Sequence, residues 1–429
     1  LSWSAITSGD LSVRFYDEHF TFNSAAPSCF PPANQRLYLL GLLNSIVAQF
    51  FARTLNPSLN LNPGDLAKLP VIIDEAIRPQ VENLVQANLN LAQADYDEQE
   101  ISPDFTVHPL LRLAQTTPTS QPDQAVSDAQ SDQTASAAPS SLADLCAAYQ
   151  KLCRTRQAQL QTNETTLNQL FLTAFHLTAE LSPQVQLSTL SLQVPTTSAI
   201  IRTFLSYVVG CALGRFQPPT PQPLRPPMPP SLQPSAPLSP SSLAAPRPPL
   251  QTIPDFLSYL NTFLSTYFGA GNLSANLNFI ADQLDRTYHE PAPTAIARYL
   301  AKQFFTDHAR TYHHCPIYWQ FTSGRAHAFD AFLYAHRYRP TNLAPADPST
   351  KTSTLSVLQS LVASAQPSPI TTRCTPARRA RLQQELQAYA AALAPLAADP
   401  PRLNFDLGVA ANYARLQPLL AKLPRRRNP

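Results

Sequence analysis

The residues with the clearest potential for chemistry are the histidines gathered within residues 308–336. Histidine and cysteine are common ligands of zinc, which holds them at about 2.0–2.3 Å in a tetrahedron. No two residues of this group have the C-x-x-C or H-E-x-x-H spacing that places two ligands on one face. We therefore predict packed or surface histidines in an aromatic-rich region, and no metal site. The group comprises His308, His313, His314, Cys315, His327 and His336.

Other residue types that can carry catalysis also lack the pattern that a reaction requires. Asp95, Asp97 and Glu100 could exchange protons as acid and base, but charged residues at the end of a polar helix are typically solvated. The stretch FGAGN at 268–272 suggests a glycine-rich cofactor turn, yet no predicted strand precedes it, which favours a helix end at Gly269. No G-x-S-x-G nucleophile turn is present. The residues alone indicate no catalytic, cofactor-binding or metal-binding position.

Charge is distributed unevenly along a chain whose formal net charge is only +3. Between Asp65 and Asp104, nine acidic residues face two basic ones, a local excess of seven negative charges. From Thr371 onward, ten Lys and Arg residues face three acids, and the chain ends in LPRRRNP. Basic side chains bind nucleic acid by releasing counterions, so this end is a candidate for phosphate contact, although solvated basic tails are common.

Length and composition describe a chain that can build two or three hydrophobic cores, since 44 % of its 429 residues are hydrophobic. No run approaches the roughly 20 apolar residues of a membrane helix, and no signal peptide is apparent, so we predict a cytoplasmic protein with no membrane contact. The six cysteines show no disulfide-framework spacing, which fits reduced thiols. The single methionine is Met228 and no initiator is present, which predicts the back part of a longer reading frame.

Two low-complexity segments divide the chain. Residues 116–141 are rich in Ser, Gln, Ala, Asp and Pro, and residues 217–252 are dense in proline. Neither has enough large apolar side chains to offset the entropy of ordering, so both are predicted linkers. The predicted domains are then 1–115, 142–216 and 253–429, and the last one carries the basic tail.

The predicted fold class is α+β and predominantly helical, with a small strand-rich N-terminal segment. Alternation over 11–16 and the FTF at 20–22 predict a β-hairpin with a turn at 17–19. Residues 36–55 are apolar nearly all round, which predicts one buried helix, and a polar amphipathic helix follows over 74–98. Further helices are expected within 142–182, 199–216, 256–268, 294–305 and 376–398.

The segment LNPSLNLNPGDLAKLPVI, residues 55–72, has the composition of a shaped connector. A residue before proline is pushed out of the helical region, so Asn56 and Asn62 should be extended and the preceding helix should stop. Asp65 fits the N-cap of a short helix, and the VII at 71–73 fits a brief strand.

Several segments, taken in order, resemble one family, the adenine-specific DNA methyltransferases of BREX phage-defence systems, of the PglX type. LSWSAITSGDLSVRFYDEHFTFNSAAPSCFP is similar to the end of the family's target-recognition region. ADYDEQEISPDFTVHPLL, residues 94–111, is the most specific match, although Tyr96 and Pro103 stand where the family usually has tryptophan. The other matching segments are LYLLGLLNS, the 55–72 connector, LSYVVGCALGRF, HARTYHHCPIYWQFTSG, FLYAHRY and DLGVAANYARLQPLLAKL.

The resemblance implies a parent protein that transfers a methyl group from S-adenosylmethionine to N6 of adenine in duplex DNA, within a defence system. Such enzymes need a glycine-rich turn for S-adenosylmethionine and an Asn/Asp-Pro-Pro-aromatic motif that holds the flipped base. Neither motif is found in this sequence, and the family's layout places both upstream of Leu1. This chain alone is therefore expected to be inactive, with the cofactor bound by the missing N-terminal part.

The resemblance also implies double-stranded DNA and other proteins of the defence system as partners. Basic side chains would contact phosphates, and polar side chains of the strand-rich start would contact bases. An alternative is a non-catalytic helical scaffold that binds partner proteins, because the acidic helix at 74–97 and the low net charge are unusual for a DNA-facing surface. The DNA-contact candidates are Arg14, Arg53, Asn56, Asn60, Lys68, Arg325, Arg337, Arg339, Arg425, Arg426 and Arg427.

Overall fold

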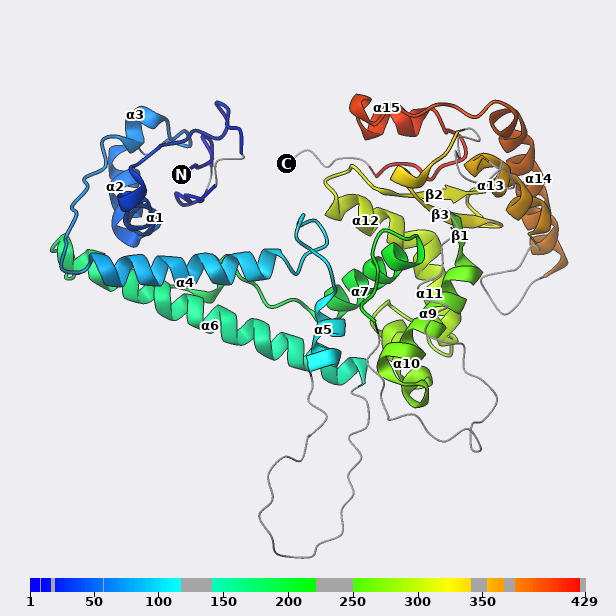
Figure 1. Cartoon of the computed structure of the whole chain (residues 1–429), viewed down its shortest axis with the longest axis horizontal. Helices are drawn as coiled ribbons and strands as arrows, with labels where there is room; N and C mark the ends of the chain where they lie inside the picture. The colour runs from blue at the N-terminus through cyan, green and yellow to red at the C-terminus, as the bar shows by residue number, and fades with distance from the viewer. Residues whose placement is uncertain are drawn as a thin grey trace, which may run out of the picture. The chain divides into compact units, whose positions relative to one another are not determined.

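The computed structural model describes residues 1–7, 9–16, 20–56, 58–116, 141–220, 250–340, 353–365 and 375–424 (Figure 1). The chain divides into two compact units, each built from segments that are distant in sequence. Unit 1 comprises Leu1–Asp97 and Gln150–Pro195, and unit 2 comprises Glu98–Tyr149 and Thr196–Pro429. The predominantly helical α+β class is confirmed. The predicted linkers lie mostly outside the described residues, so the domain boundaries drawn at them stay predictions.

Unit 1 is a set of helices around one main apolar core. Its helices are α1 (Arg36–Leu43), α2 (Ile46–Leu55), α3 (Pro63–Leu66), α4 (Arg78–Tyr96) and the part of α6 (Leu142–Ala174) that follows residue 149, with 3-10 turns at Ala33–Gln35 and Leu187–Thr189. Tyr38 of α1, Val81 of α4 and Phe171 of α6 meet in the core, where each is fully buried. The predicted amphipathic helix at 74–98 is therefore α4, which packs its apolar stripe on α1.

The single helix predicted over 36–55 is wrong, because the chain breaks between α1 and α2. The Asn44 side chain accepts a hydrogen bond from the N–H of Val13 at 2.9 Å and donates to its carbonyl at 3.0 Å. Ser45 is extended and caps α2, as serine favours. Together α1 and α2 have the length and apolar composition of a membrane span but bend by 75°, and no single helix of the described residues is long and apolar enough to cross a membrane.

The first residues of unit 1 are extended but do not form the predicted hairpin. Ser2 pairs with both Arg14 and Ser28 through isolated antiparallel bridges. Residues 20–22, the predicted partner strand, form no bridge within the part of the chain that the structure describes, and the predicted turn at 17–19 lies outside that part. The alternation over 11–16 therefore identified extended backbone but not its partner.

Unit 2 holds a three-stranded antiparallel sheet. Its strands are β1 (Leu250–Thr252), β2 (Tyr318–Thr322) and β3 (Asp330–Tyr334), in the order β1-β3-β2. Leu333 of the central strand pairs with Leu250 on one side and Trp319 on the other. These three side chains are buried, so the sheet is part of the core and not a surface ribbon.

Unit 2 also contains helices that pack on this sheet or on one another. They are α5 (Pro109–Thr116), α7 (Thr197–Ala212), α9 (Ile253–Phe268), α10 (Leu273–Asp282), α11 (Ala292–Tyr299), α12 (Phe305–Thr311), α13 (Thr354–Ser364), α14 (Pro376–Ala398) and α15 (Val409–Ala414), with a π-helical turn at Leu300–Phe304. The helix predicted over 376–398 is confirmed. The predicted helix end at Gly269 is also confirmed, since this residue terminates α9 with a φ of 83° that suits glycine.

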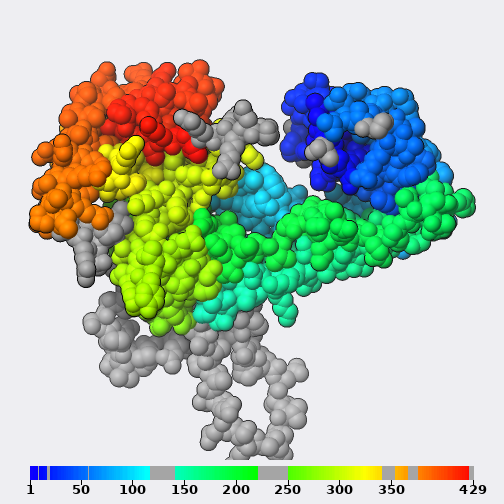
Figure 2. All heavy atoms as spheres, turned by 180° about the vertical axis from the view of Figure 1, so that it is seen from behind, coloured from blue at the N-terminus to red at the C-terminus, as the bar shows by residue number. Residues whose placement is uncertain are grey.

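The C-terminal helices share one core with the sheet. Leu355 and Leu358 of α13, Leu393 of α14 and Tyr413 of α15 are buried in the same cluster as Trp319 of β2. Figure 2 shows the orange and red surface of these helices joined directly to the yellow region that contains β2 and β3. These C-terminal helices, within the described residues, are therefore integral to unit 2.

Candidate functional site

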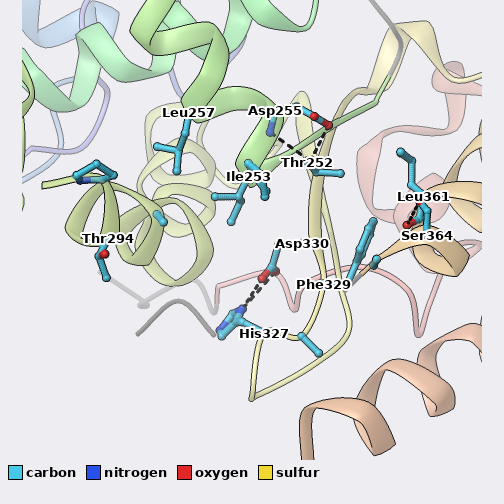
Figure 3. Close-up of a pocket in the computed structure, with 15 residues that line it drawn as sticks. Thr252, Ile253, Asp255, Leu257, Thr294, His327, Phe329, Asp330, Leu361 and Ser364 are labelled. Atoms are coloured by element: carbon cyan, nitrogen blue, oxygen red, sulfur yellow. Dashed lines mark hydrogen bonds and ion pairs between the residues drawn. The ribbon is translucent and has the colours of Figure 1, made fainter. Parts of the chain in front are cut away.

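A pocket of about 460 Å³ opens in unit 2 beside the start of β3 (Figure 3). Its walls come from the first turn of α9, the first turn of α11, the loop before β3 and the end of α13. Volumes of this size are usual for small-molecule sites, which typically enclose about 300–1,000 Å³. The lining residues are Thr252, Ile253, Pro254, Asp255, Leu257, Pro293, Thr294, Ala297, His327, Ala328, Phe329, Asp330, Leu361, Ser364 and Ala365.

His327 and Asp330 form the polar centre of this pocket. Nδ1 of His327 lies 3.0 Å from Oδ2 and 3.2 Å from Oδ1 of Asp330, and Gln320 donates to Oδ1 at 2.9 Å. Burial raises the pKa of Asp330, and the contact with His327 opposes that rise. The pairing leaves Nε2 as the ring nitrogen with no hydrogen-bond partner among the described residues. This dyad has the i, i+3 spacing H-x-x-D, which was visible in the sequence.

Glu385 of α14 fixes the loop that carries His327. Its carboxylate accepts hydrogen bonds from the Ser323 hydroxyl at 2.8 Å and from the Ala326 N–H at 2.8 Å. The loop needs this support because His327 has a φ of 54°, in the left-handed region that a non-glycine residue seldom adopts. The imidazole is therefore held in place before any ligand arrives.

The other histidines serve packing more than ligation. His308 is buried, and its Nε2 accepts hydrogen bonds from the N–H groups of Ile317 and Tyr318 at 3.1 and 3.0 Å. His336 lies against the ring of Phe405. Among the described residues, no three His, Cys, Asp or Glu side chains are grouped to hold a metal ion.

Residues 98–111 of the acidic segment belong to unit 2, where two of its acids are buried. Glu100 is buried, and its Oε1 accepts hydrogen bonds from Arg215 at 2.7 Å and from the hydroxyls of Tyr318 and Tyr312 at 2.9 and 3.1 Å. Glu98 is likewise buried and accepts from the Tyr149 hydroxyl at 3.0 Å. The expectation that Glu100 is solvated is wrong, because its partners stabilise its charge inside the protein.

The 55–72 connector of unit 1 is organised by its own side chains. Asn56 donates to the carbonyl of Asn60 at 2.6 Å and to Oδ2 of Asp65 at 2.9 Å. Asn56 and Asn62 are extended, as predicted, but the N-cap of α3 is Asn62, with Asp65 three residues on in a capping box. The strand expected at 71–73 is absent, since these described residues have no regular structure. Hydrogen bonding by Lys68 and by the Asn62 N–H lowers the pKa of Asp65.

Replacing Asn56 with alanine should lower the free energy of unfolding of unit 1 by about 1–2 kcal/mol, because several local hydrogen bonds are lost. The two tryptophans of the chain lie in different units, Trp3 in unit 1 and Trp319 in unit 2. Urea unfolding of 5-fluorotryptophan-labelled protein, followed by ¹⁹F NMR, therefore reports each unit separately. Asn60→Ala is the matched control, since within the described structure Asn60 forms hydrogen bonds through its backbone. Equal losses in the two variants would contradict the structural role of Asn56.

The remaining candidates of unit 1 have acidic neighbours. Arg53 forms an ion pair with Asp10, and both side chains are more than half exposed. Lys68 pairs with Asp65 at 3.2 Å. Such exposed pairs are weak, so a phosphate can compete for either cation.

Arg14 has the acidic residue Glu164 nearby, and the two influence each other through their charges. Its side chain is exposed, and its charge opposes the rise that burial gives to the pKa of the nearby Glu164.

The candidates of unit 2 differ in accessibility. Arg325 and Arg339 are exposed. Arg337 is half-buried, donates to the carbonyl of Leu213 at 2.8 Å, and has a pKa lowered by burial and by the charge of Arg339. Its guanidinium therefore has a structural contact. Arg425, Arg426 and Arg427 lie outside the described residues.

Two curated proteins are similar to this chain along most of its length. The chain is 30 % identical over 352 residues to the adenine-specific methyltransferase PglX of Lacticaseibacillus casei (strain Zhang), a match that covers 80 % of this chain and 27 % of the relative. It is 24 % identical over 375 residues to the adenine-specific methyltransferase BrxX of Escherichia coli O9:H4 (strain HS), which covers 80 % of this chain and 29 % of that relative. No family model matches the chain.

The chain thus spans less than a third of the length of either relative. The two matches agree with the resemblance drawn from the order of the sequence segments, and each covers four-fifths of this chain. The prediction of the family is confirmed: this chain is related to the BREX adenine-specific methyltransferases of the PglX type.

Proposed function

We propose that this chain is the C-terminal part of a site-specific DNA adenine-N6 methyltransferase of a phage-defence system, and that it recognises or clasps DNA. The single observation that carries this proposal is the similarity to PglX and BrxX over 80 % of the chain. The parent uses S-adenosylmethionine in the cytoplasm, on double-stranded DNA and together with other proteins of the system.

The glycine-containing stretch at 268–272, which lies within the described residues, does not have the form of an S-adenosylmethionine turn. A cofactor turn of that class follows a strand and opens a helix. Gly269 and Gly271 instead join the end of α9 to a 3-10 turn before α10. The proposal therefore places cofactor binding and methyl transfer in another part of the parent, and predicts that this chain alone neither binds labelled S-adenosylmethionine nor methylates DNA.

Among the arginines predicted from the sequence as DNA contacts, the three exposed ones within the described residues are the best candidates for phosphate contact. Arg14, Arg325 and Arg339 expose their side chains, and neither an ion pair nor a buried contact is recorded for their guanidinium groups in the described structure. Arg53 and Lys68 are weaker candidates because each already faces a carboxylate. The side chain of Asn56 already forms hydrogen bonds within the 55–72 connector, so it is also a weaker candidate.

One observation favours the scaffold alternative. Unit 1 exposes large apolar side chains close together in sequence, with Phe20 and Phe22 each 61 % exposed and Phe30 74 % exposed. Exposed apolar patches often mark contacts with other proteins. A scaffold would bind through such side chains and would need few basic residues.

Salt dependence separates the two functions. If the chain binds a fluorescent mixed-sequence duplex through phosphates, the logarithm of the binding constant should fall linearly with the logarithm of salt concentration. Arg325→Gln combined with Arg339→Gln should reduce that slope by about 2, since each phosphate contact contributes about 0.9. Lys302→Gln, which removes an exposed charge from the π-helical turn, is the matched control and should leave the slope unchanged. Absence of binding at low salt, or a slope insensitive to the arginine variants, would contradict the DNA role.

A further inference from the structure

We propose that the pocket between α9, α11, α13 and the His327 loop binds a small organic cation with an apolar body. This site is independent of the DNA role proposed above. The apolar walls of the pocket favour a ligand with an apolar body, and its polar groups favour a ligand with a positive charge.

The walls are apolar on several sides. Ile253 and Leu257 of α9, Phe329 before β3 and Leu361 of α13 all line the pocket, and Figure 3 labels each of them. Ile253 and Phe329 are each only 6 % exposed, so they form fixed walls instead of mobile surface side chains. A ring or short chain can bury its surface there, and removal of that apolar surface from water favours binding.

The pocket lining carries a net negative charge whether or not His327 and Asp330 share an extra proton. Asp255 lies at the exposed rim and Asp330 at the buried end, while none of the lining residues is Lys or Arg. If one proton is shared between His327 and Asp330, the lining carries a charge of −1 from Asp255. Without that proton, the dyad adds a second negative charge. An anionic ligand is therefore repelled and a cation attracted.

The hydrogen-bonding groups of the pocket also favour a ligand that donates a hydrogen bond. When Asp330 is ionised and His327 is neutral, Nδ1–H donates to the carboxylate and Nε2 is left as a hydrogen-bond acceptor. The Glu385 anchor on the loop means that this acceptor does not have to be ordered on binding. A protonated amine supplies both the donor and the positive charge.

The test uses three compounds with one ring system and different charges: tryptamine, 3-methylindole and indole-3-acetate. Tryptamine should bind at least about tenfold more tightly than indole-3-acetate, with 3-methylindole between them. Isothermal titration calorimetry gives the affinities. The ring-proton NMR signal of His327, assigned by its loss in His327→Gln, should shift only with compounds that bind.

Two variants locate the site. Thr294→Trp, at the half-exposed wall of α11, should fill the space and abolish binding of tryptamine. Asp255→Asn should reduce the preference for tryptamine over indole-3-acetate by about threefold, because a partly exposed charge contributes modestly. Asp399→Asn, which removes an exposed carboxylate outside the pocket, is the matched control and should change neither affinity.

The proposal is overturned if tryptamine and indole-3-acetate bind equally, if neither binds at millimolar concentration, or if a folded Thr294→Trp variant retains the affinity for tryptamine. Thermal melts of each variant establish that it is folded. A shift of the His327 signal by indole-3-acetate but not by tryptamine would also overturn the assigned charge.

Discussion

Replacement of Arg215 with methionine is expected to lower the free energy of unfolding of unit 2 by about 3–5 kcal/mol, because it leaves the buried Glu100 without its cation. Arg215 donates to Oε1 of Glu100 at 2.7 Å and to the hydroxyl of Tyr318 at 3.2 Å, and it stacks on the ring of Phe216. Burial disfavours the charge of Arg215, yet the facing Tyr318, Tyr312 and Glu100 raise its pKa. Urea unfolding followed at the ¹⁹F signal of Trp319 measures the loss.

Two further variants distinguish a buried ion pair from simple loss of a long side chain. Arg286→Met removes the contact with the largely exposed Asp282 and the hydrogen bonds to Asn278 and to the Glu290 carbonyl. It leaves no buried charge unpaired, so it should cost only about 1–2 kcal/mol. Glu100→Gln in the Arg215→Met background should recover part of the loss, since it removes the unpaired charge. Equal costs for Arg215→Met and Arg286→Met, or no recovery in the double variant, would show that the pair is not the source of stability.

The sequence predicted most helices, since their signals are local. Helix α14 begins at the Pro-Ala step after Thr375 and ends where predicted, and Gly269 closes α9. The break between α1 and α2 was missed because Asn44 bonds to Val13, which is 31 positions away. Apolar periodicity carries no information about such a contact.

The three-stranded sheet of unit 2 shows more strongly that a local sequence pattern does not identify distant partners. The alternation near residues 11–16 gave extended backbone, but the ladder of the described residues pairs β1 with β3, segments about eighty positions apart in sequence. Strand pairing at that distance depends on the intervening helices and cannot be derived from the local pattern.

The site residues show the same difference between features that depend on local sequence and features that depend on distant contacts. The acidic segment was identified by its resemblance to the family, whereas its burial depends on distant partners: Tyr149 lies 51 positions from Glu98, and Tyr318 lies 218 positions from Glu100. The His327–Asp330 dyad, three residues apart, was within reach of a local search. The spacings of zinc motifs, C-x-x-C and H-E-x-x-H, do not detect such a pair.

Lowering the pH should reduce the free energy of unfolding of unit 2 at pH values well above those at which ordinary carboxylates bind protons. Burial, reinforced by Arg112 and Arg215 respectively, lowers the pKa of both His108 and His308 from 6.5 to about 3. The folded unit therefore keeps both rings neutral while the unfolded chain binds protons below pH 6.5. Stability should be level above that pH and fall below it, by about 2 kcal/mol for each histidine at pH 5.

The contacts of the two rings explain why neither can accept a proton in place. Nδ1 of His108 accepts from the N–H of Leu110 at 3.3 Å, and Nε2 of His308 accepts from the N–H groups of Ile317 and Tyr318. Protonation would turn each acceptor into a donor facing another donor. The cost is therefore electrostatic and geometric together.

His308→Gln should remove about half of this acid sensitivity, because the amide oxygen of glutamine can take the place of Nε2 without titrating. The measurement is the free energy of unfolding from pH 7 to pH 5, followed at the ¹⁹F signal of Trp319, and the decisive quantity is the difference in slope between variant and parent. His336→Gln, at an exposed histidine, is the matched control and should leave the slope unchanged. A level profile between pH 7 and pH 5 in the parent would mean that the unfolded chain gains no protons over the folded one, and so that His108 and His308 are charged or solvated in the native protein.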